Sequence, residues 1–130
     1  MNIIYEKTTD KSVAQAIESV KAELKKREFG VLFELDMKAK LQEHDLELNG
    51  HAVIMDVCNP KQAQKVLNES LSVGYFLPCK IAVFSRDGKT TIGTLLPSEL
   101  MEQMPGLDLK ETAEAVEQVL RESVDAAANS

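Results

Sequence analysis

The dipeptide Asp87-Gly88 constrains the fold more than any other feature of this sequence. It separates two short runs, 80–85 and 89–95, that are rich in apolar and β-branched residues. Asp-Gly between two such runs is typical of a β-hairpin, because the tight turn needs residues that tolerate positive φ angles. The sheet therefore contains at least one antiparallel pair of strands, and a regular alternation of parallel strands and helices is excluded.

The rest of the chain alternates between strand-like and helix-like patterns. Short apolar runs predict strands at 2–8, 31–35 and 52–57, with Val31, Phe33 and Leu35 on one face of the second strand. Apolar residues spaced three and four apart predict helices at 10–28, 36–44, 60–71, 99–104 and from 108 onward. About five strands with one-sided helices predict a single α+β domain over residues 1–130, in which helices cover one face of the sheet.

Capping preferences mark the expected helix ends. Thr9 or Asp10 is expected to cap the first helix, and Gly30 is expected to follow its end. Asp108 has the position of a capping-box residue before the last helix. The small, polar tail 125–130 is expected to fray.

The composition is that of a soluble globular domain. Of 130 residues, 44% are hydrophobic and 28% are charged, which is sufficient for a core without disulfides. The net charge of −6 argues against nucleic-acid binding, which needs clustered Lys and Arg. No segment has the roughly 18 consecutive apolar residues of a membrane span, and the first residues do not resemble a signal peptide. We expect a cytoplasmic protein with reduced thiols that binds neither membranes nor nucleic acid.

A predicted buried strand that runs directly into a helix places a cysteine at a chemically favourable position. The run 52–57 leads to Cys58, Asn59 can cap the next helix, and Pro60 suits its first turn. A thiol near a helix N-terminus can have a lowered pKa and act as a nucleophile, so Cys58 is a candidate catalytic residue. The alternative is that Cys58 packs as a small hydrophobe. The helix start could also bind an anion, although Asn59 can satisfy the same N–H donors.

The second cysteine, Cys79, follows Pro78 at the start of the hairpin. If the strands that flank the helix from Pro60 are parallel neighbours, the two thiols lie at opposite ends of the sheet, and we expect no disulfide between them. The side chains that could bind a metal show no close pair; they are His44, His51, Asp56, Cys58 and Cys79. We therefore expect no metal and no cofactor.

Four stretches of the sequence resemble a known family. They are Phe29-Gly30, the run 36–41, Cys58-Asn59-Pro60 and Leu77-Pro78-Cys79. Over about residues 5–97 the chain resembles the domain of unknown function family numbered 302, a set of small bacterial and archaeal proteins. The resemblance implies a curved, mainly antiparallel sheet with helices on one face, similar to the TATA-binding-protein arrangement, and it is compatible with dimers. It implies no activity, and its motif assigns no role to Cys58, Asn59, Pro60, Pro78 or Cys79.

The sequence leaves open whether the protein is an enzyme. The first hypothesis is a small binding or interaction module with a groove at Cys58-Asn59-Pro60, where the candidate ligand-binding residues are these three together with Pro78 and Cys79. The second is a thiol-dependent enzyme or redox sensor that uses Cys58. We expect a homodimer, and the apolar patch of Leu100, Met101 and Met104 is either a dimer surface or a lid over the core.

Overall fold

The fold is that of a computed structural model, which describes residues 2–104, 106 and 108–129. Strands and helices follow one another along this part of the chain. They are β1 (Ile4–Thr9), α1 (Val13–Lys26), β2 (Gly30–Asp36), α2 (Met37–Gln42), β3 (His51–Cys58), α3 (Pro60–Glu69), the 3-10 helix η1 (Leu71–Tyr75), β4 (Cys79–Arg86), β5 (Lys89–Leu95), α4 (Pro97–Met101) and α5 (Lys110–Asn129).

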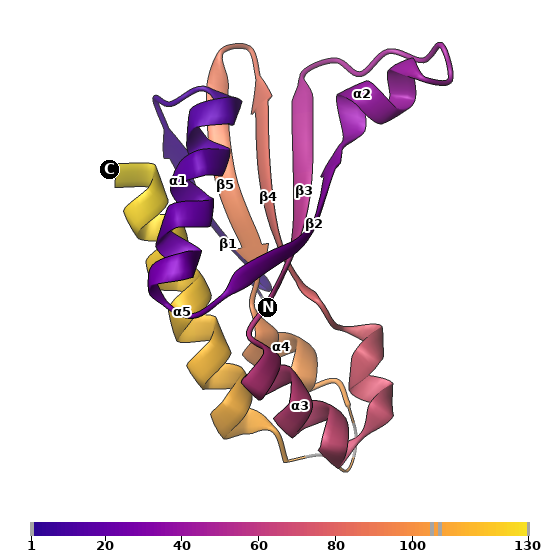
Figure 1. The fold of residues 1–130 in the computed structure, drawn as a ribbon, viewed down its shortest axis with the longest axis vertical. Helices are drawn as coiled ribbons and strands as arrows, with labels where there is room; N and C mark the ends of the chain where they lie inside the picture. The colour runs from indigo at the N-terminus through magenta and orange to yellow at the C-terminus, as the bar shows by residue number, and fades with distance from the viewer. Residues whose placement is uncertain (1, 105, 107, 130) are drawn as a thin grey trace.

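The strands form one sheet in which every neighbouring pair is antiparallel. Their order is β1-β5-β4-β3-β2, so the first two strands of the chain lie at the two edges. The helix α1 connects these edges, and α5 packs beside it (Figure 1). The predicted turn joins β4 to β5, with φ angles of 55° at Asp87 and 80° at Gly88. The expected α+β class, with a mainly antiparallel sheet, is confirmed.

The main hydrophobic core lies between one face of the sheet and the helices α1 and α5. The predicted stripe of α1 is buried, and its residues Val20 and Leu24 are fully inaccessible to solvent. Alternate residues of the three central strands point toward this stripe, as the two-residue period of a strand requires. The sheet contributes Val53, Met55, Val57, Ile81, Val83 and Ile92, and α5 contributes Leu120, Val124 and Ala127.

The strand β2 departs from the predicted alternation. Its pairing with β3 shifts register between Val31 and Phe33, so Leu32 is an extra residue in a β-bulge. Val31 therefore lies opposite Val57 on the helix-covered face, whereas Phe33 and Leu35 point to the other face. The expectation that Val31, Phe33 and Leu35 share one face is wrong, because one extra residue reverses the alternation.

The ends of α1 also differ from the expected ones. The helix starts after Ser12, whose hydroxyl accepts a hydrogen bond from the Gln15 amide, while the Gln15 side chain accepts one from the Ser12 amide. This capping box lies later in the chain than the predicted cap. After the helix, the residue with a positive φ angle is Glu28, at 65°. Gly30 instead pairs within β2.

The helix α5 includes residues 125–129 of the tail that was expected to fray, and residue 130 lies outside the described residues. The chain is helical to its last described residue, and Ala127 is buried. The segment before α1 supports its end, because the Thr9 hydroxyl and the Lys11 ammonium donate to the carbonyls of Ala128 and Ala127 at 3.0 and 2.8 Å. A cation at a helix C-terminus also complements the dipole. Within the described residues, neither α5 nor any other helix is long and apolar enough to cross a membrane.

Candidate functional site

A second, smaller hydrophobic cluster lies at the end of the molecule that contains α3, η1 and α4 (Figure 1). Its buried residues are Val66, Val73 and Leu109. Four partly buried side chains pack around them, namely Leu67, Leu77, Met101 and Met104. The predicted methionine patch thus covers this cluster, which favours the lid over the dimer surface.

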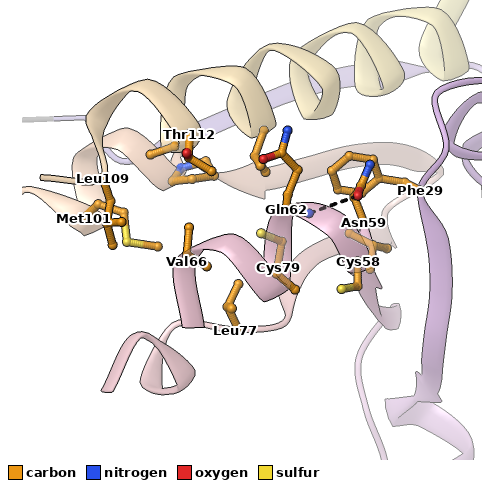
Figure 2. Close-up of a pocket in the computed structure, with 15 residues that line it drawn as sticks. Phe29, Cys58, Asn59, Gln62, Val66, Leu77, Cys79, Met101, Leu109 and Thr112 are labelled. Atoms are coloured by element: carbon orange, nitrogen blue, oxygen red, sulfur yellow. Dashed lines mark hydrogen bonds between the residues drawn. The ribbon is translucent and has the colours of Figure 1, made fainter. Parts of the chain in front are cut away.

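A cavity of about 40 Å³ lies where this small cluster meets the end of the sheet (Figure 2). Met101, Leu109 and Thr112 lie on one side of it, and Phe29 and Asn59 lie on the other. None of its lining residues carries a formal charge, and most are apolar. They are Phe29, Val57, Cys58, Asn59, Gln62, Ala63, Val66, Leu77, Cys79, Pro97, Met101, Leu109, Thr112, Ala113 and Val116.

The strand-to-helix junction forms as the sequence predicts. Asn59 is the N-cap of α3, and its side-chain oxygen accepts a hydrogen bond from the Gln62 amide at 3.2 Å. Pro60 occupies the first turn, where no amide hydrogen is needed. The Asn59 bond occupies one of the free N–H donors on which anion binding at this helix start would depend.

The two cysteines lie at the same end of the sheet. Because β3 and β4 are antiparallel, Cys79 lies opposite Val57, the residue before Cys58. Parallel pairing of these two strands, the condition under which the thiols would lie at opposite ends of the sheet, is not met. Successive residues of a strand point to opposite faces, so Cys79 shares the helix-covered face with Val57 and Cys58 points away from it. Both cysteines are free.

Burial controls the chemistry of both thiols. It raises the pKa of Cys58. Burial, together with the neighbouring Cys58, raises the pKa of Cys79 to about 11. A lowered pKa of Cys58, one of the two alternatives drawn from its place near the helix start, does not occur, because burial disfavours the thiolate. Both side chains are therefore neutral thiols near pH 7.

A second hollow of about 190 Å³ adjoins the cavity, and we call it the outer hollow. The two spaces share the wall residues Leu77, Cys79, Pro97 and Met101. The remaining residues of the outer hollow are Tyr75, Phe76, Pro78, Lys80, Leu95 and Leu100, among which Lys80 is the charged one.

The structure brings together four of the five motif residues. Cys58, Asn59 and Cys79 line the cavity, and Pro78 and Cys79 line the outer hollow. Pro60 lines neither space and is exposed. The cavity residues that come from α4 and α5, such as Thr112, belong to no sequence motif. They lie at the site because of the tertiary fold alone, so sequence reasoning missed them.

The residues considered as metal ligands are separated. His51 Nε2 lies 3.1 Å from Asp36 Oδ2, and the Lys80 ammonium lies 2.6 Å from Asp56 Oδ1. Among the described residues, no group of three His, Cys, Asp or Glu side chains could hold a metal ion.

Comparison with known proteins identifies the family to which the chain belongs. A family model described as "Domain of unknown function DUF302" matches residues 5–127. The chain belongs to the DUF302 family. The crystal structure of an uncharacterized conserved DUF302 protein from Bacillus stearothermophilus is similar to it, with 39% identity and a TM-score of 0.89 over 98% of this chain and 99% of that one. No curated protein matches the sequence. The DUF302 membership establishes family and fold and brings no activity with it.

Proposed function

We propose that this DUF302 protein is a small binding module that takes the apolar end of an uncharged small molecule into the cavity beside α3. The observation that carries the proposal is a cavity lining without a single formal charge, formed at the motif residues Cys58, Asn59 and Cys79. Burying an unpaired charge in such surroundings costs several kcal/mol. The ligand group that enters is therefore neutral.

The size of the cavity limits what enters it. Its volume of about 40 Å³ is far below the roughly 300–1,000 Å³ of a typical ligand pocket. A short alkyl group fits the scale, and the rest of the molecule would lie in the outer hollow. Met101 lines both spaces, and a methionine side chain adapts readily because it is unbranched.

Two amide side chains supply polarity at the site. Figure 2 shows Asn59 and Gln62 side by side at the start of α3. The Asn59 oxygen is occupied by the helix cap, which leaves its NH₂ group as a donor. Gln62 adds a donor and an acceptor. This arrangement suits a ligand with a carbonyl or hydroxyl group next to its apolar part.

The state of the cysteines supports binding over thiol chemistry. Burial raises the pKa of both thiols, whereas an activated nucleophile needs a lowered one. Free thiols are also typical of a reducing compartment. We therefore propose that the protein acts in the cytoplasm and that Cys58 and Cys79 serve as small, neutral parts of the binding surface.

A titration with matched alkyl compounds tests the proposal. Amide NMR spectra would be recorded with n-alkanols of three to eight carbons and with n-alkylammonium and n-alkanoate ions of equal length. We expect shifts at Cys58, Asn59 and Gln62 with the alkanols and weaker ones with both ions. Equal responses to all three classes, or shifts scattered over the surface, would contradict the proposal.

A pair of alanine variants provides the control. Ala63→Leu places extra atoms at the cavity wall of α3 and should weaken alkanol binding at least tenfold. Ala22→Leu makes the same change at an exposed position of α1 and should leave binding unchanged.

A further inference from the structure

The sheet face opposite α1 and α5 carries exposed apolar side chains. The register places the side chains of Ile4, Phe33, Phe84 and Leu95 on this face, because directly paired residues point to the same side. Their exposed fractions are 48%, 56%, 39% and 40%. We call this surface the open face, and its other apolar residues in the strands include Leu35, Ala52, Ile54, Ala82 and Gly93.

We propose that the open face is the interface of a homodimer in which two copies pack their sheets against each other about a two-fold axis. A two-fold interface uses the same patch on both copies, so the patch must complement itself in size, charge and shape. The proposal rests on the register of the sheet and not on the binding cavity, although Lys80 and Leu95 of the open face also line the outer hollow.

The size of the open face suits such an interface. Its strands contain 6 to 8 residues. With strands about 4.8 Å apart and residues about 3.3 Å apart, the face covers roughly 500 Å² before side-chain relief is added. Specific dimers bury about 800 Å² of accessible surface on each partner. Two sheets packed in this way would also remove the exposed aromatic surface of Phe33 and Phe84 from water.

The charge of the open face permits two copies to approach. The whole chain has a net charge of −6. The register places two acidic residues, Glu6 and Asp56, and three basic ones, Lys80, Arg86 and Lys89, on the open face, which gives it a net charge of +1. Asp56 and Lys80 also neutralise each other at 2.6 Å. The surplus negative charge lies elsewhere, so it does not oppose this contact.

The open face carries both short and long side chains, which allows two copies of this face to pack against each other. Its shortest side chains meet near the middle, where Ala82 lies opposite Gly93. A Cβ atom at Gly93 would come within 3.1 Å of the Glu6 Cβ. Of the longer apolar side chains on this face, Phe84 and Leu95 lie two residues further along the same strands, and Phe33 lies on the edge strand β2. In a two-fold arrangement the long side chains of one copy can therefore pack over the short ones of the other.

Sedimentation equilibrium tests the interface. We expect the wild-type protein to sediment at about twice its chain mass of 14.4 kDa. Phe33→Glu and Phe84→Glu should each raise the dimer dissociation constant at least tenfold, since each places a charge in the apolar contact. Leu71→Glu is the matched control, because Leu71 is 83% exposed on η1, outside the open face; it should leave the constant unchanged.

Two outcomes would overturn the proposal. One is a wild-type protein that stays monomeric at several hundred micromolar. The other is a dimer whose dissociation constant is unaffected by both folded glutamate variants, which would place the interface on another surface.

Circular dichroism verifies that each variant folds. If one does not, Phe33→Ser or Phe84→Ser replaces it, and hydrogen exchange of β4 and β5 in wild-type protein, which should slow with rising concentration, gives an independent readout.

Discussion

The two hydrophobic clusters of this protein differ in how completely they are closed. Among the residues that the structure describes, the main core contains fifteen buried residues between the sheet and two long helices. In the same part of the chain, the small cluster contains three, held by the short elements α3, η1 and α4 and the start of α5. The cavity lies at the small cluster, where packing is incomplete. The residues that contribute most to stability and those that line the cavity thus lie in different parts of the molecule. Substitutions at the small cluster should therefore be tolerated better than substitutions in the main core.

The largest expected effect is in the main core. Leu24 is fully buried under the sheet, and Leu24→Ala should lower the free energy of unfolding by about 3–4 kcal/mol, because the rigid surroundings cannot fill the space left by the side chain. Urea unfolding followed by circular dichroism measures it. A loss below about 1 kcal/mol would show that the main core is not the tighter of the two clusters.

The second effect depends on pH and on Cys79. The pKa of this thiol is about 11 in the folded protein against 9.0 without burial. The unfolded chain therefore loses the proton first, and stability falls as pH rises from 9 to 11. The expected loss is about 2–3 kcal/mol at most.

Urea unfolding at several pH values between 8 and 11 measures this loss. Cys79→Ala serves as the reference, because it lacks this thiol and keeps every other ionisable side chain of the wild-type protein. Identical slopes in the two proteins would show that the Cys79 thiol is not desolvated.

The third effect repeats the leucine truncation at the small cluster. Leu109 is buried and lines the cavity. Leu109→Ala should cost about 2 kcal/mol, less than Leu24→Ala, because a site beside an existing cavity has already lost part of its packing contacts. The same unfolding experiment measures it. Equal losses for the two variants would remove the distinction between the clusters.

The smallest effect concerns the cap of α3. Asn59→Ala removes the hydrogen bond to the Gln62 amide and should cost about 1 kcal/mol, whereas Asn59→Asp should retain most of the stability. Thermal unfolding of both variants tests this. Equal destabilisation by alanine and aspartate would show that the cap does not hold the helix start.

Much of the fold could be predicted from local sequence. The Asp87-Gly88 turn, the apolar stripe of α1 and the Asn59-Pro60 helix start act over a few residues, and all three form as expected. The prediction of a curved sheet came from the family resemblance over about residues 5–97. The family model matches a longer segment, which ends at residue 127.

The features that sequence reasoning missed depend on long-range pairing. The bulge at Leu32 gives no local signal, because an alternating run looks the same with or without an extra residue. The proximity of Cys58 and Cys79 follows from antiparallel pairing across a helix, which spacing along the chain does not reveal. The cavity also depends on long-range packing, because residues of both α3 and α5 line it. In the sequence, η1, β4, β5 and α4 lie between these two helices.

The order of the strands has a consequence for how the chain folds. The strands β2, β3, β4 and β5 are consecutive neighbours, so each can pair soon after it is formed. β1 is different: residues 4–9 pair with residues 90–95 of β5. This strand is made before the other four strands of the sheet and waits longest for its partner, and closing so long a loop is slow. Until β5 is complete, the newly made strand must be kept from pairing with other chains.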